Sequence, residues 1–276
     1  TVQEYWYRGG WMDPQEMFWR DFAAPGRMPM RRYDDPGSGD TSTLAVRLSA
    51  EPHTAVRTRF VLSWHVPNNR NDWNGNTLPG GDRMWRNYYA VLFPEGAVQS
   101  ARYALKHWER LASETEIFRD SLLCSALPEV VKEAVTANLS VLKSPTVWRL
   151  QNGTLYGWEG VSEHAGSCEG TCTHVWNYNY AVCFLFPELE RGMREADFEQ
   201  NLAPDGRMAF RMLLPYGLGP NGNRACLDGQ MGGIIKTYRD WKICGDSSWL
   251  RSLWPKVRRA LEYAWSEDNP DAWDRD

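Results

Sequence analysis

The sequence predicts a multidomain β + α protein, in which the remaining part of a β domain is followed by part of an α-helical domain. Three observations lead to this fold class. Apolar and polar residues alternate before residue 95, apolar residues recur with a helical period after it, and 276 residues are enough for two domains or for one large one.

Two short segments in the first third of the chain have the alternation expected of strands. Residues 44–48 alternate strictly and residues 56–62 alternate more loosely, with Glu51-Pro52-His53 as a turn between them. This pattern predicts an antiparallel pair of strands. A long polar loop follows over residues 67–76, and long loops on a β scaffold are often functional.

After residue 95 the apolar residues follow a helical period. Ser144-Pro145 is expected to stop one of these helices, and Gly245-Asp246-Ser247 is expected to introduce the last of them. Several helices joined by short links are typical of stacked αα-hairpins. The predicted helices cover residues 97–111, 127–142, 175–189, 232–243 and 248–265, and the third of these is expected to be largely buried.

Composition and charge argue against several classes of function. The net charge is −4, from 31 basic and 35 acidic residues that are well interspersed, so a nucleic-acid partner is disfavoured. The sequence has no run of 18 apolar residues that could span a membrane. Six cysteines are too few for a disulfide scaffold in a chain of this length and favour a reducing compartment, with the cytoplasm slightly preferred. Fifteen tryptophans suit carbohydrate binding, although filling a core is the commoner role of any single one.

Residues 152–180 contain the densest group of carboxylates, histidines, cysteines, glycines and aromatic residues. Glu159 lies there between Trp158 and Gly160, and nearby glycines allow a ligand to approach the backbone closely. The segment leads into the predicted buried helix, whose N-terminal amides could keep a carboxylate ionised. These are useful conditions for a carboxylate nucleophile, although a solvated or capping glutamate is the commoner outcome.

Other residues of the same segment leave alternatives open. Glu163 and Glu169 are competing carboxylates. Cys168, Cys172 and His174 have a Cys-x3-Cys-x-His spacing that could bind zinc. The spacing is short and matches no strong zinc signature, so we predict no metal and no cofactor.

Several segments, taken in order, resemble glycoside hydrolase family 116, which includes bile-acid β-glucosidase, also called non-lysosomal glucosylceramidase. Residues 60–68 resemble the strand that closes the N-terminal β-sandwich of that family. The resemblance covers nearly the whole chain and is strongest from residue 144 to residue 265. The other resembling segments are Ser144-Pro145-Thr146, Tyr156-Gly157-Trp158-Glu159-Gly160, Phe186-Pro187-Glu188-Leu189-Glu190, Thr237-Tyr238-Arg239-Asp240 and Gly245-Asp246.

The resemblance implies a β-sandwich joined to an (α/α)6 toroid. Residues 1–94 would be the C-terminal part of the sandwich, and residues 95–143 would be a linker with the first helices. Residues 144–276 would be the N-terminal part of a truncated toroid. The chain would then be a fragment of a divergent, bacterial-type member of the family.

The resemblance also implies retaining hydrolysis of β-glucosides or β-xylosides by two carboxylates, with carboxyl groups about 5–5.5 Å apart. Glu159 matches the nucleophile, and the partner would be a carbohydrate or glycoconjugate substrate. Trp158, His174 and Asp228 are further candidates for lining the sugar site. Asp228 is included because it opens the helix that leads into Tyr238-Arg239-Asp240.

Two departures from the family pattern narrow this expectation. The general acid/base aspartate of the family would lie beyond Asp276, so we expect the chain alone to be inactive. Pro215-Tyr216-Gly217 stands where relatives carry the Pro-His-Asp that binds sugar hydroxyls, so neither glucose specificity nor a lipid substrate is implied. A non-catalytic carbohydrate-binding or scaffold protein of the same fold, or a zinc protein using Cys168, Cys172 and His174, are the alternatives.

Overall fold

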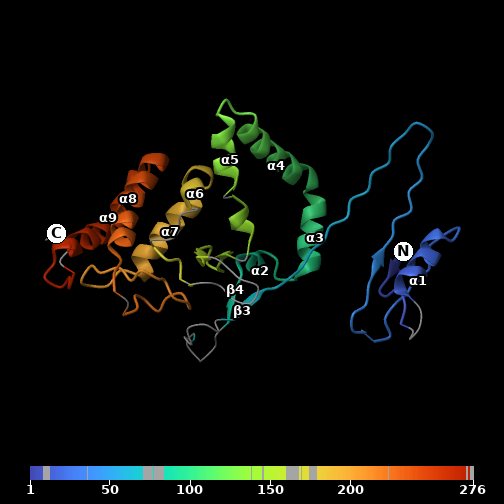
Figure 1. Cartoon of the computed structure of the whole chain (residues 1–276), viewed down its shortest axis with the longest axis horizontal. Helices are drawn as coiled ribbons and strands as arrows, with labels where there is room; N and C mark the ends of the chain where they lie inside the picture. Colours follow the sequence, from blue (N-terminus) through green and yellow to red (C-terminus); the bar gives the residue numbers. More distant parts are fainter. Residues whose placement is uncertain are drawn as a thin grey trace. The chain divides into compact units, whose positions relative to one another are not determined.

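The computed structural model of the chain describes residues 1–8, 13–35, 37–70, 77, 84–137, 139–144, 146–159, 168, 170–173, 179–222, 224–271 and 273. These residues divide into two compact units, Thr1–Val61 and Leu62–Asp276. The division falls inside the segment that the sequence assigns to the β domain. Figure 1 labels helices α1 to α9 and strands β3 and β4.

The first unit combines a short pair of strands with one helix. Strand β1 (Val2–Gln3) pairs in an antiparallel manner with β2 (Thr43–Leu44). Helix α1 (Pro14–Ala23) begins after Asp13, whose side chain accepts a hydrogen bond from the backbone of the first turn, and proline at the first position needs no such partner.

Side chains connect these elements to one another. Trp6 donates a hydrogen bond of 2.7 Å to the Thr43 hydroxyl, and its ring stacks on Phe18 with 4.7 Å between ring centroids. Gln3 is fully buried and donates a hydrogen bond of 2.9 Å to Asp21. The amide of β1 therefore fixes the position of α1 in this unit.

The predicted antiparallel pair over residues 44–48 and 56–62 is wrong. Leu44 lies in a strand but pairs with Val2, and residues 45–67 contain no strand. The turn between the two segments is confirmed, since the Thr54 amide donates to the Glu51 carbonyl at 3.1 Å. The alternating apolar side chains stay exposed, Phe60 at 57% for example. Alternation stabilises a strand only where another layer covers its apolar face, and no such layer is present among the described residues of this unit.

The second unit begins with strands β3 (Asn68–Arg70) and β4 (Met84–Arg86), which pair in an antiparallel manner. The predicted change to helix near residue 95 is confirmed. The predicted helix over residues 97–111 is divided at His107, whose backbone leaves the helical region at φ −107° and ψ 18°. The helices of this part are α2 (Tyr88–Leu92), α3 (Ala97–Lys106), α4 (Trp108–Leu123), α5 (Glu129–Ala137) and the 3-10 helix η1 (Leu139–Lys143).

A short hairpin that the sequence analysis does not predict follows η1. Strand β5 (Val147–Arg149) pairs with β6 (Leu155–Gly157) in an antiparallel manner. Asn152 accepts a hydrogen bond of 3.1 Å from the Thr154 amide, and Gly153 adopts a φ of +90°, which favours glycine. Turn chemistry at Asn152-Gly153 therefore determines where this hairpin reverses.

The predicted helix over residues 175–189 is two helices, α6 (Asn179–Leu185) and α7 (Pro187–Gln200), because Pro187 begins a new helix at its first position. Helix α8 (Leu227–Cys244) starts earlier than predicted and ends at Gly245, with a φ of +70°. Helix α9 (Ser247–Glu262) begins as predicted, since the Asp246 carboxylate accepts hydrogen bonds from the Ser248 and Trp249 amides.

Helix α7 is central to the packing of this part of the chain, because it contacts α6, α8, α9 and β6. Figure 1 shows α7 beside α6 and α8. Among the described residues, three groups of buried side chains form the core around α7. The first contains Leu150, Tyr156, Trp158, Ala196, Met212 and Leu214, the second contains Phe198, Met208, Leu253, Val257 and Ala260, and the third contains Val147, Leu155 and Met193.

Within the described part of the chain, no helix is both long and apolar enough to cross a lipid bilayer.

Candidate functional site

Glu159 lies two residues after the end of strand β6 and is placed by the buried hairpin. The Trp158 amide donates to the Thr146 carbonyl at 3.0 Å, and Trp158 is only 4% exposed. Its ring packs edge-on against Trp148 and Tyr156, with ring centroids 4.6 and 5.3 Å away. The chain is therefore anchored in the core at Trp158, the residue before Glu159. The predicted contact of Trp158 with sugar stays a prediction.

Three backbone segments that are distant in sequence lie side by side at Glu159. The Thr171 amide donates to the Gly157 carbonyl at 3.0 Å, and the Glu159 amide donates to the Cys168 carbonyl at 3.3 Å. On the other side of this segment, the Met212 amide donates to the Gly170 carbonyl at 2.6 Å. These bonds place residues 210–212 next to the segment that carries Glu159.

Gly170 permits the close approach of these segments. Its φ is +94°, and a Cβ atom there would lie 2.9 Å from the Met212 carbonyl oxygen and 3.0 Å from the Cβ of Arg211. A side chain at this position would therefore push residues 211 and 212 away.

Among the described residues, the charged partner of Glu159 is Arg211. The Arg211 Nη2 atom donates to Glu159 Oε1 at 2.8 Å, and the exposed fractions of the two side chains are 16% and 28%. The guanidinium carbon of Arg211 lies 4.7 Å from the centroid of the Phe210 ring. Asn221 holds the backbone of the same residue by donating to the Arg211 carbonyl at 3.0 Å. Arg211 is thus held by the Phe210 ring under its guanidinium group, by Asn221 at its backbone and by Glu159 at its charged end.

The surroundings of Glu159 favour its ionised form. Partial burial raises the pKa of the Glu159 carboxyl, but the hydrogen bond and charge of Arg211 and the hydrogen bonds of the Cys168 and Cys172 thiols outweigh it. The net result is a pKa below the ordinary glutamate value. The carboxylate is therefore charged and partly exposed at neutral pH, which is the state that a nucleophile requires.

Asp228, the second predicted sugar contact, is an exposed residue in the first turn of α8. It accepts a hydrogen bond of 2.9 Å from the Gly229 amide and interacts with Cys226. Burial, with a hydrogen bond to Asp228, raises the pKa of the Cys226 thiol to about 11, and Cys226 in turn interacts electrostatically with Cys172. Asp228 therefore interacts with Cys226, and Cys226 interacts with Cys172, one of the two thiols that hydrogen-bond to Glu159.

Several predicted site residues lie outside the described residues. These are Glu163, Glu169 and His174. Cys168 is exposed and Cys172 is buried, and neither is in a disulfide. Among the side chains that the structure describes, no group of three or more His, Cys, Asp or Glu could hold a metal ion. Binding of zinc by Cys168, Cys172 and His174 stays untested, because one of the three is not described.

Tyr216, which the resemblance places where relatives carry a histidine, is half-buried and packs against the core that contains Trp158. Burial raises the pKa of its hydroxyl, and hydrogen bonds with Thr154 and Gln200 oppose this effect. The next amide, that of Gly217, donates to Gln200 at 2.8 Å.

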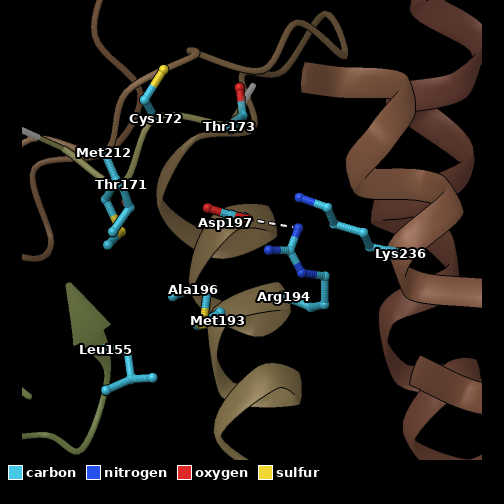
Figure 2. A pocket seen from close by; sticks show the side chains of 10 residues that line it. All are labelled: Leu155, Thr171, Cys172, Thr173, Met193, Arg194, Ala196, Asp197, Met212 and Lys236. Carbon is cyan, nitrogen blue, oxygen red and sulfur yellow. Dashed lines mark ion pairs between the residues drawn. The ribbon is translucent and has the colours of Figure 1, made fainter. Parts of the chain in front are cut away.

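A small pocket that the sequence pattern does not predict lies next to residues 171–173, in the segment that is paired with Glu159 (Figure 2). Thr171 and Cys172 line it on one side, and Arg194, Asp197 and Lys236 line it on the other. Arg194 Nη1 lies 3.0 Å from Asp197 Oδ2, and the Lys236 side chain extends from α8 toward this pair. The spacing of Arg194 and Asp197 on a helix is typical of a solvated face, so the sequence contains no signal that the pair is buried.

The comparison with protein families concerns the N-terminal part of the chain. Residues 2–111 match the family model described as "beta-glucosidase 2, glycosyl-hydrolase family 116 N-term". No curated protein matches the chain. The matched region ends before Glu159, so the comparison does not address the residues of the candidate site.

Proposed function

We propose that the chain is part of a retaining β-glycosidase of glycoside hydrolase family 116, whose N-terminal family model matches residues 2–111, and that its nucleophile is Glu159. The match supports a glycoside hydrolase with a carbohydrate substrate. The retaining mechanism, a β-glucoside or β-xyloside as the substrate, and the architecture of a β-sandwich followed by an (α/α)6 toroid are parts of the proposal.

In the proposed reaction the Glu159 carboxylate attacks the anomeric carbon of the sugar. A bond forms between Glu159 and that carbon while the bond to the leaving oxygen breaks, which gives a covalent glycosyl-enzyme. Water then attacks the same carbon and releases Glu159. A second carboxyl group protonates the leaving oxygen in the first step and deprotonates water in the second. We assign this general acid/base to none of the described residues.

The observation that carries the proposal is the environment of one carboxylate. Glu159 is ionised, partly exposed and held by Arg211 at 2.8 Å, at the end of a strand whose last residues are buried. Orientation of a nucleophile by fixed partners is a major source of catalytic rate. Asp228 and His174 are proposed as sugar contacts, and Trp158 is proposed to support Glu159 from the core.

An activated mechanism-based inhibitor tests the proposal. A 2,4-dinitrophenyl 2-deoxy-2-fluoro-β-glucoside has a leaving group that departs without protonation, so its reaction reports on the nucleophile without requiring the general acid. We expect mass spectrometry of the full-length protein to find one added sugar, on the peptide that contains Glu159. Glu159→Gln should take no label, and Glu267→Gln, the same change at an exposed position, should be labelled like the wild type.

Two results would contradict the proposal. A label on Glu163 or Glu169 would show that the nucleophile is a different carboxylate of the same segment. If calorimetry detects glucoside binding and no label forms, the chain is a carbohydrate-binding protein without turnover.

A further inference from the structure

We propose that Arg211 is the positioning residue of the site: its guanidinium group holds the Glu159 carboxylate in the orientation needed for attack. This inference rests on the proposed function of Glu159 as the nucleophile. It assigns to Arg211 no contact with the reacting atoms of the substrate.

The geometry of the pair supports this role. Arg211 Nη2 lies 2.8 Å from Glu159 Oε1, although the two residues are 52 positions apart in sequence. A carboxyl group at the end of a glutamate has three rotatable bonds, and a charge-assisted hydrogen bond to a fixed donor restricts them. Such a bond is useful only if its donor is itself immobile.

Arg211 satisfies this condition through contacts at both ends. Its guanidinium group lies over the Phe210 ring, and Asn221 binds its carbonyl oxygen at 3.0 Å. The backbone on each side is paired with the loop that follows Glu159, because the Thr173 amide donates to the Phe210 carbonyl at 3.0 Å and the Met212 amide donates to Gly170 at 2.6 Å. The charged group therefore loses little conformational entropy when it binds Glu159.

The charge of Arg211 has a second effect, on ionisation. Among the described residues, the titratable or charged groups that face Glu159 are Arg211, Cys168 and Cys172. An arginine stays protonated at every pH of an enzyme assay. Removal of Arg211 leaves burial as the main influence on Glu159, so the pKa of the carboxyl should rise.

The experiment follows the rate of labelling by the dinitrophenyl 2-fluoro-β-glucoside from about pH 4 to pH 8 in the full-length protein. We expect Arg211→Gln to slow labelling by about 100-fold at neutral pH, because the carboxylate loses its orientation. The acid limb of its pH profile should move to higher pH. Added guanidinium ion should restore part of the rate. Arg258→Gln is the matched control, because Arg258 pairs with Glu262 on the exposed face of α9.

A conservative variant keeps the proposal testable if Arg211→Gln does not fold. Arg211→Lys retains the positive charge but not the planar fork, so its acid limb should stay near that of the wild type while its rate falls. Labelling of Glu159 at an unchanged rate in the lysine variant, or an unmoved acid limb in a folded glutamine variant, would overturn the role of Arg211 alone. A label on another residue in the wild type would overturn both this inference and the proposed nucleophile.

Discussion

The Nη2 atom of Arg239 on α8 lies 2.5 Å from Oε1 of Glu190 on α7, and the Glu190 side chain is fully buried. Asp240 also binds Arg239, at 2.8 Å, and is 3% exposed. Burial raises the pKa of the Glu190 carboxyl, and the positive charges of Arg194 and Arg239 oppose that effect. The pair joins the two helices at a point where the Glu190 and Asp240 carboxylates are almost completely removed from water and Arg239 is only partly exposed.

Glu190→Gln should therefore destabilise the second unit. The change removes the negative charge that compensates buried arginines, which typically costs about 3–5 kcal/mol of unfolding free energy. Chemical denaturation followed by circular dichroism measures the difference. Glu262→Gln removes the partner of Arg258 on an exposed face and should cost at most about 0.5 kcal/mol. Equal losses in the two variants would show that the buried pair has no special role.

Gly170→Ala should separate the loop after Glu159 from residues 210–212. Its Cβ would lie 2.9 Å from the Met212 carbonyl oxygen, so the ion pair between Glu159 and Arg211 should be disturbed and labelling by the 2-fluoro glucoside should slow. Gly217→Ala is the control, because Gly217 has a similar φ of +103° but no atom within 4 Å of the added Cβ. Backbone strain alone would slow both variants to the same extent, which would contradict the importance of the close approach.

Gln230→Leu should destabilise the contact between α8 and α9. The Gln230 side chain is 1% exposed, donates to the Ala260 carbonyl at 2.7 Å and accepts from the Met208 amide at 2.9 Å. Leucine leaves these buried groups without partners, and we expect a loss of about 3 kcal/mol, measured by thermal unfolding. Gln151→Leu, in the exposed turn of the β5–β6 hairpin, should change stability by less than about 0.5 kcal/mol.

Asp21 should make the first unit sensitive to acid. A hydrogen bond from Arg31 lowers the pKa of the Asp21 carboxyl, burial opposes it, and a hydrogen bond from Gln3 lowers it further. Because the folded-state pKa is below the unfolded value of about 3.9, the contribution to stability is complete above that pH and is lost as the pH falls through the folded-state value. Hydrogen exchange of peptides from α1, corrected for intrinsic rates, should increase in this range.

The variant Asp21→Asn identifies the source of that sensitivity. It cannot ionise, so its peptides from α1 should exchange faster than those of the wild type at neutral pH and should show a weaker dependence on pH in the acid range. An unchanged acid response would assign the sensitivity to other carboxyl groups of the unit.

The sequence alone predicted those features that depend on a few neighbouring residues. Gly245 and Asp246 end one helix and begin the next as predicted, because a left-handed glycine and a capping carboxylate act within a single turn. Pro187 is a local signal of the same kind. It begins helix α7, so the predicted helix over residues 175–189 is divided there. The order of short segments also indicated a resemblance to glycoside hydrolase family 116, whose N-terminal family model matches residues 2–111.

The tertiary structure decided which of these local patterns became buried or paired. The alternation over residues 56–62 did not form a strand because no described layer covers its apolar side chains. Glu159 could be selected as a candidate from its neighbours, but Arg211 could not, because their contact depends on backbone pairing between segments 52 positions apart. In the same way Glu190 and Arg194 have the spacing of a solvated helix face, and only the packing of α8 against α7 removes them from water. Local propensity acts over one turn, whereas desolvation and ion pairing depend on what the rest of the chain brings into contact.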